Sequence, residues 1–414
     1  MALILHAVSN VRRMKSGLAH HFSDFNDICR ERGHAFRERM FTPLVTISLF
    51  CLQILYHNTS IVHLRQLSGM DFCASSYSDA RKNLPLPIFT AFMEIMTQKL
   101  ADIQDAIRPK ILCGRRIVII DAFTFSMPDM PELLDYFGLP PGQKIGIGYP
   151  VGKVMAVIDE ATGMLVRLLC VNQFTHDMRG AIGMLKALKK DDILLGDAAF
   201  CSFAHLCLLQ NMGVDGVFCL HQRRPKKAGK TRWTKPKTCP VWMTEEQHLL
   251  LPAYIDVRVV KLHIEQKGFK TRDIFIATTL LDEVAWPDDA ITTLYRKRWD
   301  IETCFGYIKT MMKLDVLKCR TVDGIHKELV MYMIVYNIVR MEMLRAAEKQ
   351  KVNVRRISFM DAMRRLAARM LGLHGSHELI VNPSRPGRQE PRRRRRRAKN
   401  YSLLTVPRNQ MKCA

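Results

Sequence analysis

The sequence predicts a mixed α/β fold with a helical N-terminal region, a sheet-containing core and a basic C-terminal tail. Three observations predict it: apolar residues at helical spacing in the first part of the chain, β-rich apolar runs from residue 117 onward, and a concentration of Lys and Arg at the end. The 414 residues are 48% hydrophobic and 25% charged, which excludes a mainly disordered or fibrous protein. At roughly 150 residues per domain, this length suggests two to three domains.

The N-terminal region, residues 1–108, reads as helical and is predicted to bind DNA. Apolar residues recur at helical spacing over 41–67 and again over 88–107. Between them, we expect Ser75 or Ser76 to cap a short helix with three side chains that suit DNA: Tyr77, Arg81 and Lys82. Two interpretations of this helix remain open, a DNA-contacting helix in a helix-turn-helix-like domain and an ordinary solvated helix.

The core begins with three strands, a helix and a further strand. The predicted strands cover 117–125, 151–158, 164–171 and 192–197, and the predicted helix covers 177–189. This order is that of a ribonuclease-H-like core. The first and fourth of these strands each carry a carboxylate in an otherwise apolar run, at Asp121 and Asp197.

In the second half of the chain a strand-like pattern is followed by helical patterns. A basic, strand-like segment is predicted as a β-rich insertion, followed by a helix from Asp288 or Asp289 to about Leu314 and another over 325–348. The predicted organisation has five regions. They are a helical DNA-binding region (1–108), a first core part (109–214), a β insertion (215–286), a helical second core part (287–350) and a basic C-terminal region (351–414).

The charge of the chain indicates a polyanionic partner. The net charge is +24, and residues 381–414 alone hold eleven Lys or Arg against one Glu. Nucleic acid is the first candidate and an anionic membrane is the second. The membrane is the weaker candidate and is not expected, because the most apolar stretch, Phe41 to Tyr56, is short and interrupted by polar residues. The twelve dispersed cysteines suit reduced core thiols, and we expect a cytoplasmic protein.

The segment around Trp299 holds the most informative spacing. On a continuous α-helix, the side chains of Tyr295, Arg298, Glu302 and Lys309 fall within a stripe about 60° wide. A carboxylate among phosphate-binding groups suits a metal-dependent phosphoryl-transfer site. The alternative is a surface salt bridge between Arg298 and Glu302 at i,i+4.

Phosphodiester cleavage needs charge relief that two Mg²⁺ ions supply, with Mn²⁺ as a possible substitute, and these hard cations prefer carboxylate oxygen. The candidate catalytic residues and metal ligands are Asp121, Asp197 and Glu302. A carboxylate inside an apolar strand is expensive to bury unless it binds something. For each Asp taken alone, a strand-end cap or turn former remains an open alternative.

The spaced residues Tyr295, Arg298, Glu302 and Lys309 resemble the Y-R-E-K signature of DDE-type bacterial insertion-sequence transposases of the IS-four group. The text Asp192–Phe200 and the region after Asp121 are similar to that family's second and first Asp contexts, although Ala122-Phe123 replaces the Gly-Ser or Gly-Thr often found there. The resemblance covers most of the chain. It implies a ribonuclease-H-like domain with a β insertion, a DDE triad that holds metal, and phosphate contacts from Tyr295, Arg298 and Lys309.

Two further features concern the tryptophans of the β insertion and the pair His176 and Asp177. In the family a Trp of the β insertion stacks on a flipped base; Trp233 and Trp242 lie in the right region, and core packing is the more ordinary role of either. Asp177 is interpreted as a helix N-cap, and His176 as structural rather than as part of an acid–base pair.

The predicted function is a Mg²⁺-dependent DNA transposase that cuts insertion-sequence ends and joins them to target DNA, acting as a homodimer on the element's terminal repeats. Two alternatives remain: an inactive or domesticated transposase that only binds DNA, and a metal-dependent nuclease on the same core.

Overall fold

The computed structural model describes residues 25–94, 114–143, 146–265, 272–373 and 379. The chain divides into two compact units. The sheet unit covers 108–304 and 388–414, and the helical unit covers 1–107 and 305–387. Of the basic C-terminal region predicted at 351–414, residues 351–373 and 379 are described, and the concentrated basic run 381–414 lies outside the described residues. No helix of the described part is long and apolar enough to cross a membrane.

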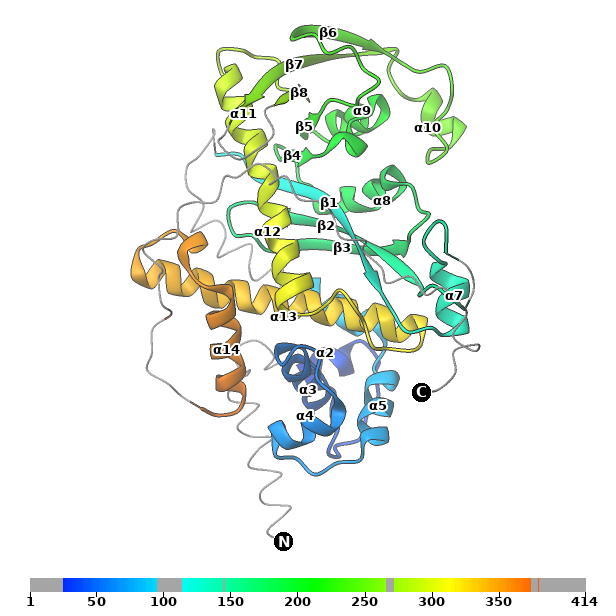
Figure 1. Ribbon diagram of the computed structural model, residues 1–414, viewed down its shortest axis with the longest axis vertical. Coiled ribbons are helices and arrows are strands. Elements are labelled where there is room, and N and C mark those ends of the chain that lie inside the picture. Colours follow the sequence, from blue (N-terminus) through cyan, green and yellow to red (C-terminus); the bar gives the residue numbers. More distant parts are fainter. Residues whose placement is uncertain (1–24, 95–113, 144–145, 266–271, 374–378, 380–414) are drawn as a thin grey trace. The chain divides into compact units, whose positions relative to one another are not determined.

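The sheet unit is built on one eight-stranded mixed sheet, in the order β3-β2-β1-β4-β5-β8-β7-β6 (Figure 1). Strands β1 to β3 are antiparallel neighbours, whereas β4 pairs in parallel with β1, and β5 in parallel with β4. This order confirms the predicted ribonuclease-H-like core. The core strands are β1 Ile117–Ser126, β2 Val151–Asp159, β3 Leu165–Asn172, β4 Ile193–Gly196 and β5 Asp215–Cys219.

The predicted β insertion extends the core sheet instead of forming a separate one. Its strands are β6 Gly229–Thr234, β7 Tyr254–Ile264 and β8 Arg272–Thr278, with the short helix α10 Glu245–Leu249 between β6 and β7. Strand β8 pairs antiparallel with β5 and so joins the insertion to the core. The range predicted for the insertion thus includes β5, which is a core strand.

Short helices accompany this sheet. α8 packs against β2 and β3, α9 against β5, and α11 against β7 and β5. Their bounds, with those of the remaining helical turns of the unit, are α7 Pro131–Phe137, α8 Asp177–Met184, η1 Leu185–Ala187, η2 Ala198–Phe200, α9 Phe203–Asn211, α11 Asp288–Arg296, η3 Lys297–Trp299 and α12 Asp300–Gly306.

The helical unit joins the N-terminal helices to two helices from the second half of the chain. α13 and α14 both pack against α3, and α13 packs against α14. All thirteen residues of α3 are buried, so this helix has no solvent face and needs partners on every side. The bounds are α2 Phe25–Glu31, α3 Pro43–Leu55, α4 Ile61–Ser68, α5 Ala74–Asn83, the π-helical turn η4 Tyr307–Met311, α13 Val322–Gln350, η5 Val354–Arg356 and α14 Phe359–Met370.

The structure changes two expectations about the helices. The range 287–350, predicted as the second part of the core, is divided, because α13 belongs to the helical unit. The helix predicted from 288 to about 314 is interrupted by a 3₁₀ turn at Lys297–Trp299 and ends in the π turn. A 3₁₀ turn has three residues per turn, so the uniform 100° spacing behind the predicted stripe does not hold through this segment.

The helix α5 does not present the side chains expected to contact DNA. Tyr77 is fully buried, and the Arg81 guanidinium lies 3.6 Å from the centre of the Phe50 ring. Arg81 also donates to the side chain of Gln53. Of the three predicted contacts only Lys82 is exposed, so the inward face of α5 serves packing.

Candidate active site

The register of two parallel strands brings Asp121 and Asp197 together. Ile119 of β1 is paired with Leu195 of β4. Asp121 and Asp197 each follow two residues later, so both side chains lie on the same face of the sheet at neighbouring positions. Gly196 precedes Asp197, and a Cβ at Gly196 would lie 2.9 Å from the Phe218 ring. Glycine therefore lets β4 reach this point between its neighbours.

Backbone amides orient both aspartates. The Ala122 N–H donates to Asp121 Oδ1 at 2.8 Å, and the Ala199 N–H donates to Asp197 Oδ1 at 2.8 Å. Asp197 is the N-cap of the 3₁₀ turn Ala198–Phe200. The cap role that the sequence left open for Asp197 is thus real, and it occupies one carboxylate oxygen.

Arg298 joins the third carboxylate to the first. Its Nη2 lies 3.4 Å from Glu302 Oε1, and its Nη1 lies 3.8 Å from Asp121 Oδ2. The Arg298 residue is only 9% exposed, and its Nε is buried without a hydrogen-bond partner among the described residues. The predicted i,i+4 contact between Arg298 and Glu302 is present, but it is a half-buried part of the carboxylate cluster and not a surface salt bridge.

The electrostatics of the cluster are unbalanced. Burial raises the pKa of Asp121 to about 6, the Ala122 amide opposes this, and the carboxylates of Asp197 and Glu302 raise it further. Burial also raises the pKa of Asp197. The Arg298 charge stabilises the ionised form of both aspartates and so opposes the rise in their pKa. Three acids share one guanidinium, so the site favours additional positive charge.

The donor chemistry of the cluster suits a hard divalent cation, because all three predicted ligands offer carboxylate oxygen. Among the residues that the structure describes, no three His, Cys, Asp or Glu side chains are arranged to hold a metal ion. The Arg298 guanidinium contacts both Asp121 and Glu302 and places one positive charge in the cluster.

A sequence model of the transposase DDE domain family matches residues 112–338, more than half of the chain. The chain belongs to the transposase DDE domain family. No curated protein matches. Among solved structures, the chain is similar to a piggyBac transposase synaptic complex with hairpin DNA, with a TM-score of 0.46 and 10% sequence identity, over 87% of this chain and 80% of that one.

The two remaining signature residues of this DDE transposase belong to different units, Tyr295 to the sheet unit and Lys309 to the helical unit. Tyr295 is 3% exposed and its ring packs edge-on to Trp299, with centroids 6.2 Å apart. It supports the Arg298 segment and does not reach solvent. Lys309 lies in the π turn of the helical unit, where burial lowers its pKa and the Asp315 charge opposes the change.

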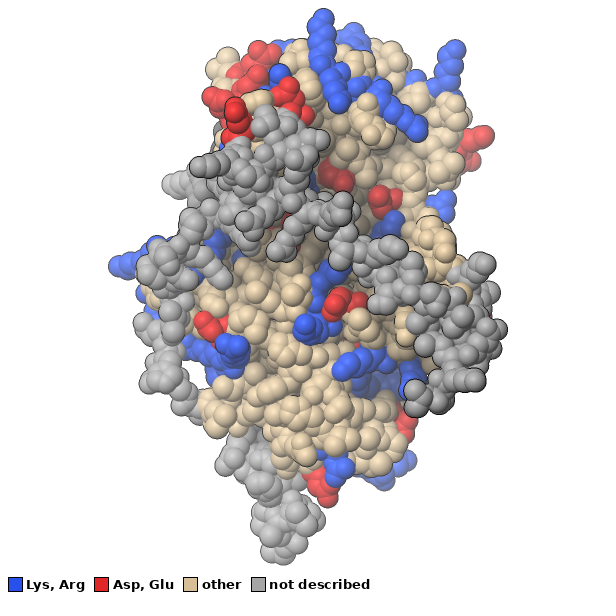
Figure 2. All heavy atoms as spheres, in the orientation of Figure 1, with Lys and Arg blue, Asp and Glu red and all other residues tan. Residues whose placement is uncertain are grey.

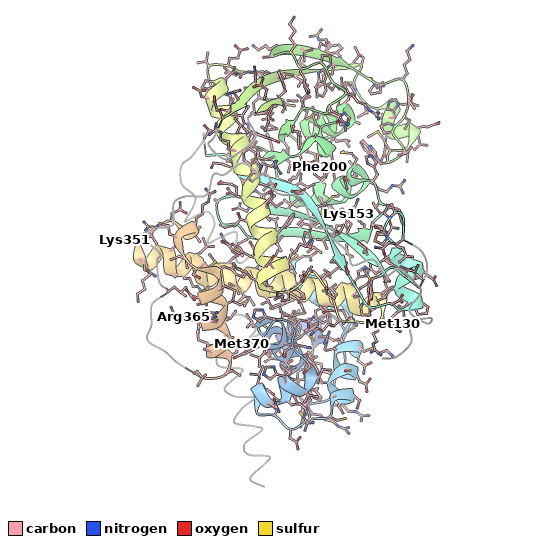
Figure 3. All side chains as sticks on the ribbon, in the orientation of Figure 1. Met130, Lys153, Phe200, Lys351, Arg365 and Met370 are labelled. Atoms are coloured by element: carbon pink, nitrogen blue, oxygen red, sulfur yellow. The ribbon has the colours of Figure 1, made fainter. Side chains whose placement is uncertain are left out.

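A lysine of the DDE domain near the site was not predicted from the sequence. Lys153 Nζ lies 2.8 Å from Asp177 Oδ1, and the Asp177 charge raises the pKa of Asp197 (Lys153 is labelled in Figure 3). A lysine inside the otherwise apolar run 151–158 was the available signal. The N-cap of α8 is His176, whose Nδ1 accepts from the Met178 N–H, so the cap predicted at Asp177 is one residue earlier.

Both tryptophans of the insertion that we weighed for base stacking have packing roles here. Trp233 is 5% exposed and belongs to the hydrophobic core of the sheet unit, with the Arg224 guanidinium 4.0 Å from its ring centre. Trp242 is partly buried and packs against the same core. The alternative of ordinary core packing therefore describes both side chains.

Proposed function

We propose that this chain is a transposase of the IS-four group, which cuts the ends of an insertion sequence and joins them to target DNA. The observation that carries the proposal is the carboxylate cluster of a DDE domain, in which Asp121 and Asp197 come from the sheet, Glu302 comes from α12, and one guanidinium serves them. These residues would hold two Mg²⁺ ions. When bound, the ions supply charge relief to the scissile phosphate and lower the pKa of the attacking water.

The protein's own groups position the carboxylates for this role. The amides of Ala122 and Ala199 fix one oxygen of each aspartate, so the remaining oxygens are directed by the strands that carry them. Glu302 comes from α12, so its reach depends on the helical segment that Tyr295 and Trp299 pack in place.

Arg298 has two tasks in this proposal. In the protein alone its guanidinium compensates the carboxylates. With the ions bound, that compensation is redundant, and the planar guanidinium is suited to hold two oxygens of a backbone phosphate. Lys309 would provide a second phosphate contact as a point charge.

The chemistry is two successive phosphoryl transfers. Water adds to phosphorus at the element end and the bond from phosphorus to the 3′-oxygen breaks, which leaves a 3′-hydroxyl and a 5′-phosphate. That hydroxyl then attacks a phosphorus of target DNA, and a 3′-hydroxyl of the target leaves with the displaced proton. Two element ends joined in one event require two copies of the site, which suits a homodimer on the DNA.

The test combines two assays with Mg²⁺. A supercoiled plasmid that carries an element end reports nicking, and an end-bearing oligonucleotide reports strand transfer. We expect both nicked and joined products. Binding without nicking would show an inactive, DNA-binding descendant, and cut but unjoined DNA would show a nuclease; either result would contradict transposition.

A further inference from the structure

A cationic cavity lies in the helical unit, between the end of α5 and the start of α13. This α5–α13 cavity has a volume of about 500 Å³, and residues at the start of α4 also line it. Figure 2 shows Lys and Arg atoms gathered where the end of α5 and the start of α13 lie in Figure 1. Its lining holds two acids, Asp323 and Glu328. Its five cations are Arg81, Lys82, Lys318, Arg320 and Lys327.

The two acids of the lining leave most of this positive charge uncompensated. Five cations against two carboxylates give the lining a net charge of +3. Lys327 Nζ lies 2.6 Å from Asp323 Oδ2, so these two charges form a pair. Arg81 is held at the wall by Gln53 and by the Phe50 ring. Within the part of the chain that the structure describes, no ion pair is made by the three exposed cations that remain, Lys82, Lys318 and Arg320.

A buried acid fixes the backbone that carries two of these three cations. Glu328 is 1% exposed, and its carboxylate accepts the backbone N–H groups of Lys318 at 3.2 Å and of Cys319 at 2.9 Å. The side-chain amide of Asn58 donates to the same carboxylate. The Lys318 ammonium donates to the carbonyl of Asn58, a neutral acceptor. Glu328 therefore sets the turn that leads to Arg320 without neutralising the Lys318 ammonium.

The end of α5 is tied to α13 by a buried lysine. The Lys327 side chain is 5% exposed, and its Nζ donates to the backbone carbonyl of Lys82 at 2.7 Å. The Lys82 side chain is exposed and makes no hydrogen bond within the described residues. The walls of the cavity are thus joined by buried polar contacts, while cationic side chains remain available at its edge. Such a site is ordered before a ligand binds, which lowers the entropic cost of binding.

The first turn of α13 adds a second feature that suits an anion. Thr321 is the N-cap of this 29-residue helix, and its side chain accepts from the Gly324 N–H at 3.1 Å. Both residues line the cavity. The N-terminus of a helix carries a partial positive charge and favours an anion. The helix end and the three cations therefore act in the same direction on one cavity.

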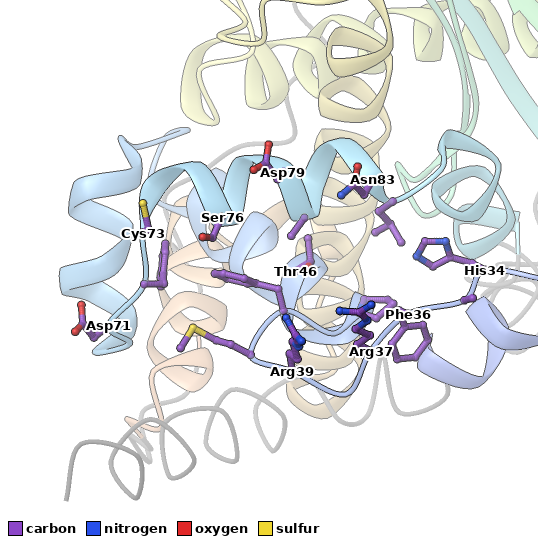
Figure 4. A pocket seen from close by; sticks show the side chains of 17 residues that line it. His34, Phe36, Arg37, Arg39, Thr46, Asp71, Cys73, Ser76, Asp79 and Asn83 are labelled. Atoms are coloured by element: carbon purple, nitrogen blue, oxygen red, sulfur yellow. The ribbon is translucent and has the colours of Figure 1, made fainter. Parts of the chain in front are cut away.

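A larger cavity of the same unit shows the contrast. It has a volume of about 690 Å³ and lies beside α5 (Figure 4). Its lining includes Arg37 and Arg39 but also Asp71 and Asp79, so its Arg and Asp charges cancel. A balanced lining gives no preference for an anion. Of these two cavities, only the α5–α13 cavity has the excess of positive charge that an anion needs.

We propose that the α5–α13 cavity binds a backbone phosphate of double-stranded DNA. The Arg320 guanidinium matches the geometry of phosphate oxygens, and Lys82 and Lys318 add point charges. The contact is independent of base sequence and positions the duplex. The proposal rests on the proposed function for the presence of DNA. It gives α5 one contact with DNA, through Lys82, in place of the three weighed from the sequence.

The test uses the full chain and a random-sequence duplex at several salt concentrations. The variant Lys82→Gln/Arg320→Gln removes two exposed cations whose side chains make no hydrogen bond within the described residues, so its unfolding temperature should match that of the parent protein. Each phosphate contact contributes a slope of about −0.9 to log K against log salt, so we expect the slope to become shallower by about 1 unit. Lys82→Arg/Arg320→Lys, which keeps both charges, should retain most of the slope.

The matched control is Arg37→Gln/Arg39→Gln, which removes the same charge at two exposed positions that line the balanced cavity. We expect it to change the slope by less than half as much. Equal changes in both double variants would overturn the proposal, because net charge alone would explain them. Inorganic phosphate that binds the α5–α13 cavity and is not displaced by duplex would overturn DNA as the ligand. None of these outcomes depends on DNA cleavage, so failure here is distinguishable from failure of the proposed function.

Discussion

Buried carboxylates are arranged in opposite ways in the two units. In the sheet unit one guanidinium, that of Arg298, contacts Asp121 and Glu302, and its charge also acts on Asp197. In the helical unit one carboxylate, that of Glu342, is contacted by the two guanidinium groups of Arg345 and Arg369. Only the first arrangement gathers several acids around one cation, which is the arrangement suited to added metal ions.

A buried pair of one cation and one anion shows how charged residues stabilise the fold without a ligand. Arg116 Nε donates to Asp192 Oδ1 at 2.9 Å, and both side chains are less than 10% exposed. One cation meets one anion, and no further ligand is needed. Several acids gathered around one cation, and not the mere presence of charged residues, therefore mark the candidate active site.

The largest expected effect is on cleavage. Asp121→Asn, Asp197→Asn or Glu302→Gln removes one carboxylate from the negative cluster. Loss of a ligand that contributes several kcal/mol to the transition state lowers the rate by about 10³-fold or more. Plasmid nicking with Mg²⁺ measures the rate, and duplex affinity should change little. Asp129→Asn, an exposed acid after β1, is the control; an equal loss there would break the distinction between the cluster and acids in general.

The next effect concerns acid sensitivity. His205 is fully buried, its Nδ1–H donates to the carbonyl of Phe200, and burial lowers its pKa to about 4 from 6.5. The unfolded chain therefore takes up a proton first as the pH falls. This group's cost to stability appears below pH 6.5 and is complete below pH 4, at about 3 kcal/mol.

The variant His205→Asn keeps a donor toward Phe200 and removes this titration. Thermal unfolding from pH 7.5 to 4 should then show a smaller loss of stability than in the parent protein. An unchanged pH profile would show that a group other than His205 controls the loss of stability in acid. The charged clusters of the two units would then have to be compared above pH 7 only.

Arg298→Gln leaves the carboxylates without their cation. Removal of one partner from a buried pair costs about 3–5 kcal/mol. Asp121 and Glu302 are 20% and 32% exposed, so we expect a loss of about 2–3 kcal/mol at pH 7.5 in a metal chelator. Mg²⁺ should restore part of it. Arg298→Lys is the control with charge retained; an equal loss in both variants, insensitive to Mg²⁺, would show a packing defect instead.

The smallest effect has the opposite sign. The pKa of Asp121 is raised above its ordinary value of 3.8 to about 6, so the folded protein holds this proton more tightly than the unfolded chain does. The ionised carboxylate thus opposes folding most fully above pH 6. Asp121→Asn should raise stability without metal by about 1–2 kcal/mol at pH 7.5, as measured by urea unfolding, and the gain should fade toward pH 4. A destabilised variant would contradict an excess of negative charge in the cluster.

Short-range patterns predicted most of the sheet unit. The strands β1 to β4 lie within a residue or two of their predicted ranges, because each is a continuous apolar or alternating run. The carboxylates Asp121 and Asp197 were recognisable as acids in such runs. Lys153 and its contact with Asp177 were not predicted, because the pairing depends on the fold that places β2 beside the start of α8.

The sequence by itself determined the ranges of the core strands, the acids that interrupt apolar strands and the i,i+4 spacing of Arg298 and Glu302, because these depend on neighbours in the chain. Only the tertiary structure decided that α13 packs with α3, that Tyr77 is buried, and that Lys82 and Arg320 line one cavity. Burial and net charge are sums over residues far apart in sequence. Local patterns list the contributing groups, but only the folded chain sets which of them share a site.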